Sequence, residues 1–325
     1  MAAGKLGAGG IGIDGVLQLE ARLNSGCDTS DRLDSSSLQQ EARALVPLAT
    51  LHERRLASGT GNGDDERDGL LRQLLAWFKF EFFKWVSEPK CEQCGGSTRS
   101  IGSASPSADD LAGGAQRVEL YTCKQCSASV RFPRYNDALR LLRTRRGRCG
   151  EWANAFTLFC RALDFSARYV YDVTDHVWTE VFSSSRNRWL HCDPCENKLD
   201  SPLIYSSGWK KKLSYVFAFG PGEAVDVINR YVLADAWPAV RKSRSQVSES
   251  YLQSRIAVLD TQRRALLPPP SLLLRDTRRA PDILELANPA ATRDLEAGEA
   301  GGRETGSVEW RAARGELGGG GQVCV

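Results

Sequence analysis

The sequence predicts an α+β fold, in which one buried helix packs against an antiparallel sheet and a cysteine-rich lobe lies beside this core. Three observations lead to this prediction. A strongly apolar helical pattern begins at Cys149, and three strand-like runs separated by short turn signals follow it directly. Upstream, two CxxC pairs flank a polar insert. We therefore expect the helix and the sheet to share one core, and the cysteines to organise a separate lobe.

Composition restricts the class of protein. The chain has 325 residues, 42% of them apolar, which suffices for a sizeable core. Its net charge of +3 is too small to predict nucleic-acid binding by itself, and no run of about 18 apolar residues predicts a membrane span. Ten cysteines, with no N-terminal apolar stretch of signal-peptide length, indicate a reducing compartment. We expect a monomeric cytoplasmic protein, with the nucleus as a further location.

The first part of the chain has a weak pattern. Residues 1–66 are Gly-rich and then Ser/Asp-rich, so we expect a variable and largely disordered region, although EARALVPLATLHERRLA could form one helix. From Leu70 the run LLRQLLAWFKFEFFKWV has apolar residues at helical spacing, which predicts a buried helix that ends before Pro89. This helix and the cysteine module form a predicted unit over residues 67–130, in which STRSIGSASPSADDLAGGA is an exposed loop.

The predicted core covers residues 131–237. The helix that begins at Cys149 is followed by the runs SARYVYDV, HVWTEVF and RWLHCD, whose short separations favour an antiparallel meander. Just before the helix, seven arginines between Arg131 and Arg148 could attract an anionic or carbonyl-bearing partner, or could form an ordinary solvated face. Residues 238–325 are expected to form a helical segment, stopped by PPP at 268–270, and then a loose low-complexity extension.

Two CxxC pairs predict a metal site. Cys91 and Cys94 are separated by 28 residues from Cys123 and Cys126, and four thiolates can close a tetrahedral zinc site with no position left for water. We predict one structural Zn²⁺ ion, with a redox pair or unligated thiols as the alternatives.

A third pair, Cys192 and Cys195, follows His191 and could suggest a second metal site. Strand alternation instead places Cys192 on the same face as Leu190, as a small core residue. We therefore expect no metal at this pair.

A nucleophile and its partners are predicted at the ends of three consecutive elements. Cys149 lies between glycines at a helix N-terminus, where unpaired N–H groups lower the pKa of a thiol. His176 opens the second strand and Asp193 closes the third, so a base and an orienting carboxylate could meet there. Each residue alone could be structural, and His191 competes for the role of base. His176 is preferred because His191 and Asp193 lie two residues apart on one strand.

At this point the sequence resembles a known family. GRCGEWANAFTLFCRALDFSARYVYDVTDHVWTEVF and RWLHCDPCENKLDSPLIYSSGWKKKLSYVFAFG resemble the cytoplasmic peptide:N-glycanases of the transglutaminase-like superfamily, as do LLAWFKFEFFKWVSEPKCEQCG, YTCKQC and GRETGSVEWRAARGE. The resemblance implies a transglutaminase-like fold, a triad of Cys149, His176 and Asp193, and zinc on the four cysteines. It also implies that Trp85, Trp189 and Glu180 contact the substrate; each is equally compatible with a structural role.

The implied activity is the release of N-linked glycans from misfolded glycoproteins that carry high-mannose glycans, with conversion of asparagine to aspartate through a thioester. A ubiquitin-receptor shuttle protein is the implied partner, because no domain that would recruit an unfolding ATPase is recognisable. Cys192 departs from the family pattern, where an aliphatic residue is usual. The alternatives are a transglutaminase-like acyltransferase and a catalytically silent glycan- or protein-binding scaffold.

Overall fold

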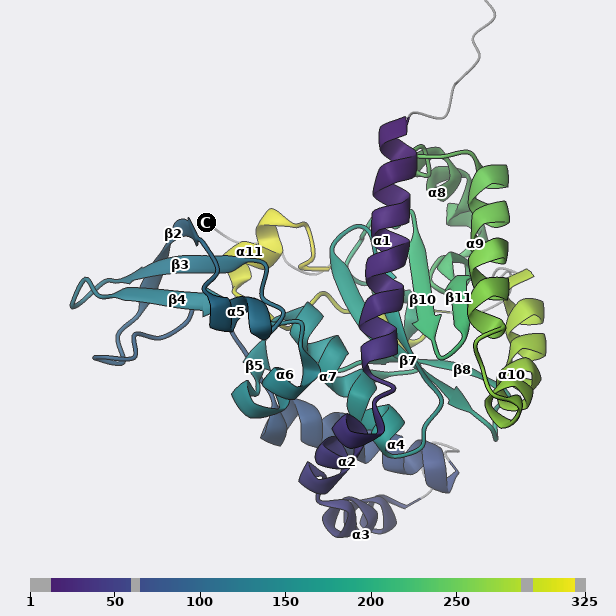
Figure 1. Cartoon of the computed structure of the whole chain (residues 1–325), viewed down its shortest axis with the longest axis horizontal. Coiled ribbons are helices and arrows are strands. Elements are labelled where there is room, and N and C mark those ends of the chain that lie inside the picture. The colour runs from purple at the N-terminus through teal and green to yellow at the C-terminus, as the bar shows by residue number, and fades with distance from the viewer. Residues whose placement is uncertain (1–12, 60–64, 288–294, 319–325) are drawn as a thin grey trace, which may run out of the picture.

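The core is an antiparallel sheet covered by helices on both faces (Figure 1). The computed structural model describes residues 13–59, 65–287 and 295–318. The three predicted strands are confirmed as the centre of this sheet, and they pair as an antiparallel meander. In order across the sheet, the strands are β11 (Glu223–Asp226), β10 (Val216–Gly220), β6 (Ala167–Asp172), β7 (His176–Ser183), β8 (Arg188–Asp193) and β9 (Lys198–Leu199).

The predicted central helix is α7 (Cys149–Ala162), which packs on β6 and β7. Its buried face contacts α4 (Glu66–Trp77) and the π-helical turn η1 (Phe78–Phe82) that continues α4. The Phe78 and Trp152 rings meet edge to face with centroids 5.5 Å apart. The helix predicted from Leu70 is therefore present, but it packs in the main core and not with the cysteine lobe.

The expectation of disorder over residues 1–66 is wrong for the described residues from Ile13 onward. They form α1 (Ile13–Arg32), α2 (Ser36–Leu45) and α3 (Leu48–Ser58), so the single helix expected near Pro47 is in fact two. The apolar stripe of α1 is narrow, so the sequence pattern does not predict this helix. Leu19, Leu23 and the close approach of Gly26 to Phe219 hold α1 against the sheet.

The cysteine lobe extends away from the core (Figure 1). It is a three-stranded antiparallel sheet of β2 (Thr98–Ala104), β3 (Val118–Cys123) and β4 (Ser129–Pro133). Much of the insert expected to be an exposed loop is β2 together with α5 (Ala108–Ala112), since Ser107 and Asp110 form a capping box there. A short parallel pair, β1 (Lys84–Trp85) and β5 (Arg146–Gly147), lies between lobe and core.

Most of the predicted basic run is neutralised within the fold. The arginines form ion pairs with acidic residues of the lobe and of α7, so the run is not a free patch. These pairs are Arg131–Asp110, Arg134–Glu119, Arg134–Glu151, Arg140–Asp109 and Arg148–Glu119.

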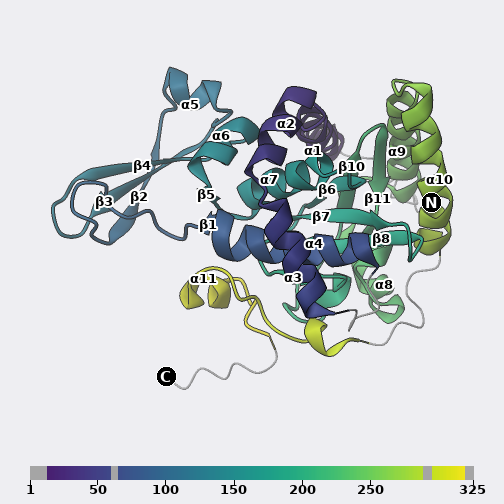
Figure 2. The same cartoon turned by 90° about the horizontal axis from the view of Figure 1, so that it is seen from below.

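The C-terminal part returns across the molecule toward the lobe (Figure 2). The PPP sequence does not only end a helix, since Pro269 begins the next one. The expectation of a loose extension is wrong for residues 295–318, where Arg303 and Glu316 are almost fully buried. The remaining helices are α6 (Ala138–Thr144), α8 (Trp237–Ser243), α9 (Glu249–Arg264), α10 (Pro269–Ala287) and α11 (Val308–Ala313).

Across the described ranges, none of the helices combines the length and the apolar character needed to cross a bilayer.

Candidate active site

The thiol of Cys149 lies at the first position of α7, as predicted. Glu151 turns back to accept the N–H of Arg148 at 3.0 Å, and the Arg134 guanidinium holds the same carboxylate at 2.6 and 2.8 Å. A Cβ at residue 147 would lie 2.4 Å from Cβ of Glu151, so only glycine fits there. The helix start is thus fixed by a buried carboxylate, and Cys149 receives the positive end of the helix dipole.

His176 and Asp193 meet at adjacent ends of β7 and β8. Nε2 of His176 lies 2.8 Å from Oδ2 of Asp193, and both side chains are fully buried. Oδ1 of Asp193 accepts the backbone N–H groups of Cys195 at 2.8 Å and Glu196 at 3.2 Å. Nδ1 of His176 is buried without a hydrogen bond of normal geometry in the described part of the chain. That nitrogen remains available to the thiol.

The charges of the three groups support one another. Burial opposes ionisation of Cys149, but the adjacent His176 outweighs burial, so the pKa of the thiol is below its ordinary value. Burial also opposes protonation of His176, but the charge and hydrogen bond of Asp193 raise its pKa above the ordinary value. The pKa of Asp193 is low, since the charge of His176 overcomes burial. The arrangement favours a thiolate beside an imidazolium.

Two residues that the sequence analysis did not assign extend this group. Tyr205 donates its hydroxyl to Oδ2 of Asp193 at 2.9 Å, and Nε2 of His191 lies 2.7 Å from the same hydroxyl. Nδ1 of His191 accepts the N–H of Ser201 at 3.3 Å, so the proton of the neutral ring is on Nε2. Burial lowers the pKa of His191 to about 4. His191 is therefore a neutral donor to Tyr205, and both of its ring nitrogens are already engaged in hydrogen bonds.

The predicted substrate residues do not lie together. Trp189 is 1% exposed, and the Arg168 guanidinium stacks on its ring at 3.7 Å. Glu180 is completely buried and binds Arg168, Arg230 and the Tyr231 hydroxyl. These surroundings exclude contact with a substrate in the present conformation, so the substrate role expected for Trp189 and Glu180 does not fit.

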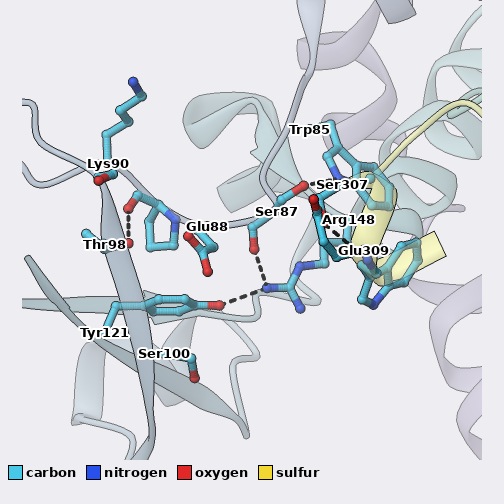
Figure 3. Close-up of a pocket in the computed structure, with 14 residues that line it drawn as sticks. Trp85, Ser87, Glu88, Lys90, Thr98, Ser100, Tyr121, Arg148, Ser307 and Glu309 are labelled. Atoms are coloured by element: carbon cyan, nitrogen blue, oxygen red, sulfur yellow. Dashed lines mark hydrogen bonds between the residues drawn. The ribbon is translucent and has the colours of Figure 1, made fainter. Parts of the chain in front are cut away.

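Trp85, by contrast, lines an open cavity of about 570 Å³ between the lobe and the C-terminal segment (Figure 3). Trp310 of α11 forms part of the same wall, with its ring centroid 6.2 Å from that of Trp85. The Arg148 guanidinium lies in the wall and donates to the Tyr121 hydroxyl at 3.0 Å and to the Ser87 carbonyl at 3.1 Å. Aromatic faces with hydrogen-bonding groups between them suit a polar ligand with apolar faces.

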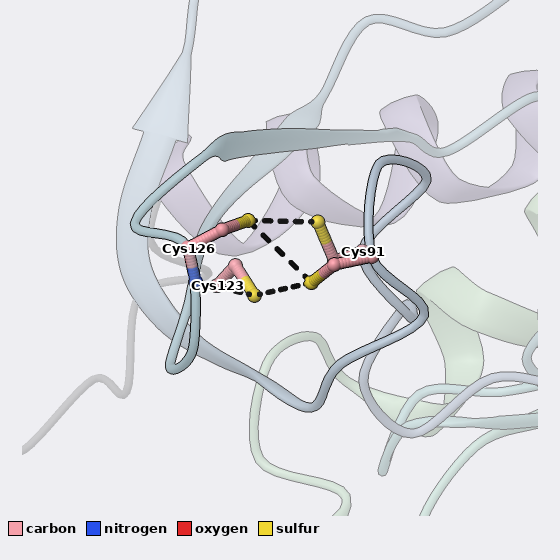
Figure 4. Close-up of side chains that lie close together, drawn as sticks. Cys91, Cys123 and Cys126 are labelled. Atoms are coloured by element: carbon pink, nitrogen blue, oxygen red, sulfur yellow. Dashed lines mark hydrogen bonds between the residues drawn. The ribbon is translucent and has the colours of Figure 1, made fainter.

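The four predicted metal ligands lie together (Figure 4), in the β3–β4 turn and in the loop before β2, at the end of the lobe sheet away from α6. Their sulfurs all lie within 4.8 Å of one another, and the pairs Cys91–Cys126 and Cys94–Cys123 are 3.6 and 3.5 Å apart. Four sulfurs at about 2.3 Å from one ion would be about 3.8 Å apart, close to these distances. N–H groups of Cys126 and Gln125 lower the pKa of Cys123 to about 6. The cluster can hold a metal ion.

Cys192 and Cys195 form no comparable site. Both are fully buried, and burial raises the pKa of each thiol well above its ordinary value. The prediction of Cys192 as a core residue is confirmed.

Comparison with known proteins identifies the fold. A model described as the transglutaminase-like superfamily matches residues 100–194, and a model described as the Rad4 transglutaminase-like domain matches residues 166–263. A solved Rad4–Rad23 structure, bound to a 6-4 photoproduct UV lesion, matches with a TM-score of 0.51 over 88% of this chain and 60% of that chain. Its sequence identity is 15%, so this match shows the fold alone.

Curated relatives are much more similar in sequence. Each is named peptide-N(4)-(N-acetyl-beta-glucosaminyl)asparagine amidase. The Gallus gallus protein is 50% identical over 293 residues, and the Homo sapiens protein is 47% identical over 299 residues; each alignment covers 88% of this chain. The Arabidopsis thaliana protein is 43% identical over 86% of this chain. The chain spans less than half the length of these relatives, 44%, 44% and 39% respectively. It therefore belongs to the transglutaminase-like superfamily and, within it, with the peptide:N-glycanases.

Proposed function

We propose that the chain is an amidase that hydrolyses the bond between an N-glycan and the side chain of its asparagine. The observation that carries this proposal is the thiol of Cys149 at a helix N-terminus, next to the buried pair of His176 and Asp193. The names of the relatives supply the class of amide, and the site supplies a nucleophile, a proton donor and an orienting carboxylate.

The reaction follows from the charges of these groups. The Cys149 thiolate attacks the carbonyl carbon of the glycosylated asparagine, and the His176 imidazolium protonates the nitrogen as the C–N bond breaks. The glycan leaves as a glycosylamine, and a thioester remains on the sulfur. Water, deprotonated by the now neutral imidazole, attacks this thioester, and cleavage of the C–S bond releases aspartate. The backbone N–H of Cys149 is the proposed donor to the oxyanion.

The cavity beside Trp85 and Trp310 is the proposed place for the first sugars of the glycan. Sugar rings present apolar faces that pack on indoles, while their hydroxyls need donors and acceptors such as Arg148 and Tyr121. Because the cavity lies between the lobe and the C-terminal segment, only a flexible or unfolded glycoprotein could bring its asparagine into the cleft. This supports misfolded glycoproteins as substrates, and high-mannose glycans are proposed on the basis of the family resemblance alone.

The metal proposed for the four cysteines is Zn²⁺, in a structural role, since four sulfurs leave no coordination position for water. We propose a cytoplasmic location, with the nucleus as a further one, because the cysteines that the structure describes are free. A ubiquitin-receptor shuttle protein is the proposed partner, on the basis of the family resemblance.

Replacement of Cys149 by alanine tests the activity. A denatured N-glycoprotein is incubated with the C149A variant and with C27A, which removes a buried thiol of α1 that belongs neither to the triad nor to the four-cysteine cluster. We expect C27A, like the unmodified protein, to convert asparagine to aspartate and to release the intact glycan, as measured by mass spectrometry. Continued conversion by C149A would contradict the proposal. Transfer of the acyl group to an added amine, without glycan release, would indicate a transglutaminase. Glycan binding without any product would indicate a scaffold.

A further inference from the structure

Arg303 is an unusual residue of the C-terminal segment, residues 295–318. Its side chain is completely buried, and its guanidinium lies between three indoles, 4.5 Å from Trp310, 4.7 Å from Trp209 and 5.5 Å from Trp85. Nη1 pairs with Glu316 at 3.0 Å. Nη2 is buried without a hydrogen-bond partner among the residues that the structure describes. A buried cation with an unsatisfied hydrogen-bond donor destabilises the fold unless a nearby negative charge compensates it.

The C-terminal segment is tied to the chain on both sides of the His176–Asp193 pair. Arg314 pairs at 2.7 Å with Asp175, the residue directly before His176. On the other side, Glu196, three residues after Asp193, accepts the backbone N–H of Glu304 at 2.7 Å and of Thr305 at 3.2 Å. These contacts fix the position of residues 303–305 relative to the site.

One indole connects the cation to the reacting groups. The ring of Trp209 lies 5.0 Å from the His176 imidazole and 4.7 Å from the Arg303 guanidinium. After burial and His176, the charge of Arg303 is the largest influence on Cys149, and it lowers the pKa of the thiol. The charge of Arg134 also interacts with this thiol, but Glu151 and Glu119 pair with the guanidinium and neutralise it. The titratable groups that interact with Cys149 are His176, Asp175, Tyr169, Arg134, Cys195 and Arg303.

We propose that Arg303 is a positioning residue of the active site, whose guanidinium is brought there by the C-terminal segment and stabilises negative charge on the Cys149 sulfur. The inference rests on the proposed role of Cys149 as the nucleophile. The C-terminal segment is then part of the reactive site and not only a cover over it. A thiolate that is stabilised by two cations, His176 and Arg303, is present for the attack on the carbonyl at lower pH than one stabilised by His176 alone.

Alkylation of the thiol tests the charge of Arg303 without any glycoprotein. The rate of Cys149 carbamidomethylation by iodoacetamide is measured against pH, by mass spectrometry of the peptide that begins at Cys149. R303M removes the cation at similar length, R303K retains it, and R314M loosens the same segment at Asp175. We expect R303M to raise the midpoint of the curve of alkylation rate against pH by about one pH unit. R303K and R314M should each move it by less than half as much.

An equal midpoint for R303M and the unmodified protein, both folded by their tryptophan fluorescence, would overturn the proposal. An equal upward shift in R314M would also overturn it, because loosening of the segment would then explain the effect.

Glu316 gives a second test, with the opposite sign, should R303M fail to fold. E316Q removes the anion that partly neutralises Arg303 and leaves the guanidinium in place. The proposal requires the midpoint to move to lower pH in E316Q, whereas general loosening of the segment would move it up. An unchanged or raised midpoint in folded E316Q would overturn the proposal.

Failure of this inference differs from failure of the proposed function. Glycan release that persists in C149A removes the amidase mechanism whatever the alkylation midpoints are. If C149A loses glycan release as expected, but R303M and the unmodified protein have identical alkylation midpoints, only the proposed role of Arg303 is contradicted.

Discussion

Nε2 of His176 and Oδ2 of Asp193 lie 2.8 Å apart in a pair that is fully shielded from solvent. The carboxylate makes four contacts, one with the imidazole, one with the Tyr205 hydroxyl and two with the backbone N–H groups of Cys195 and Glu196. A carboxylate held by this many donors cannot rotate freely, so it fixes the imidazole plane and the ring tautomer.

Substitution of Asp193 by asparagine should therefore abolish most of the activity without unfolding the protein. An amide can present its N–H₂ group to Nε2, which would reverse the tautomer of His176 and remove its charge partner. We expect kcat for glycan release to fall by about 10³- to 10⁴-fold, as in triads whose aspartate is changed. The measurement is single-turnover deglycosylation beside a thermal melt. A loss of less than tenfold would contradict the orienting role of Asp193.

The pH dependence of the thiol is a second prediction. The pKa of Cys149 is lowered and that of His176 is raised, so the thiolate–imidazolium pair exists between the two values. Alkylation of Cys149 should stay fast below pH 8.5, where a free thiol is mostly protonated. In H176A, burial acts without its largest counterweight, and the alkylation midpoint should rise above that of a free thiol. A midpoint that is equal in H176A and the unmodified protein would contradict the pair.

The raised pKa of His176 also makes the stability of the fold depend on pH. A histidine whose folded pKa is raised stabilises the fold fully below its unfolded value of about 6.5, and loses this contribution as pH rises through the folded pKa. The lowered pKa of Cys149 contributes the opposite slope until the unfolded thiol ionises at about pH 8.5. The free energy of unfolding should therefore fall with pH above about 8.5, and H176A should show a weaker fall in denaturant titrations.

The residues predicted from the sequence are those whose local pattern carries the information. The cysteine spacing places four sulfurs near one another, and Cys149, His176 and Asp193 each lie at the end of a recognisable element. The structure brings the last two together because β7 and β8 pair antiparallel. Local periodicity is sufficient to predict residues that lie at the ends of recognisable helices and strands.

Other features depend on contacts between distant segments, which periodicity does not show. Alternation gives the face of β7 on which Glu180 lies, but not that Asp282 of α10 and Arg230 cover that face. Residues 295–318 are Gly-rich and lack an apolar repeat, and their order comes from contacts such as Arg303 with Trp209. Tyr205 follows no motif that would connect it to Asp193.

Removal of the Tyr205 hydroxyl should change the pH profile of the enzyme. Y205F leaves Oδ2 of Asp193 with one donor fewer and the Nε2 proton of His191 without its acceptor. The less stabilised carboxylate attracts the imidazolium more strongly and raises the pKa of His176, so the basic limb of kcat/KM should move to higher pH. We also expect kcat to fall by about tenfold. Y231F, another buried tyrosine whose hydroxyl binds Glu180, should lower stability without moving this limb. An unshifted limb in Y205F would contradict the prediction.

Metal removal should unfold the lobe first. The lobe core includes only a few apolar residues around Cys91 and Cys123, so the bound ion is expected to supply much of its stability. We expect one zinc ion per chain by elemental analysis, and faster proteolysis within residues 91–133 after chelation. Loss of glycan release should accompany this change, because Tyr121 and Thr98 form a wall of the cavity. C94S should lose the metal, whereas C27A should retain it. Full metal content in C94S would contradict four-sulfur coordination.

Glu180 should prove to be a residue of stability and not of substrate binding. Its carboxylate lies between the guanidinium groups of Arg168 and Arg230, and E180Q would leave two buried cations undercompensated. We expect the free energy of unfolding to fall by about 3 kcal/mol. KM for a glycopeptide should be unchanged at temperatures where the variant is folded. E285Q is the matched control, since Glu285 pairs with Arg230 at the rim, and its loss should cost under about 1 kcal/mol. A raised KM in folded, stable E180Q would show instead that this carboxylate reaches the glycan.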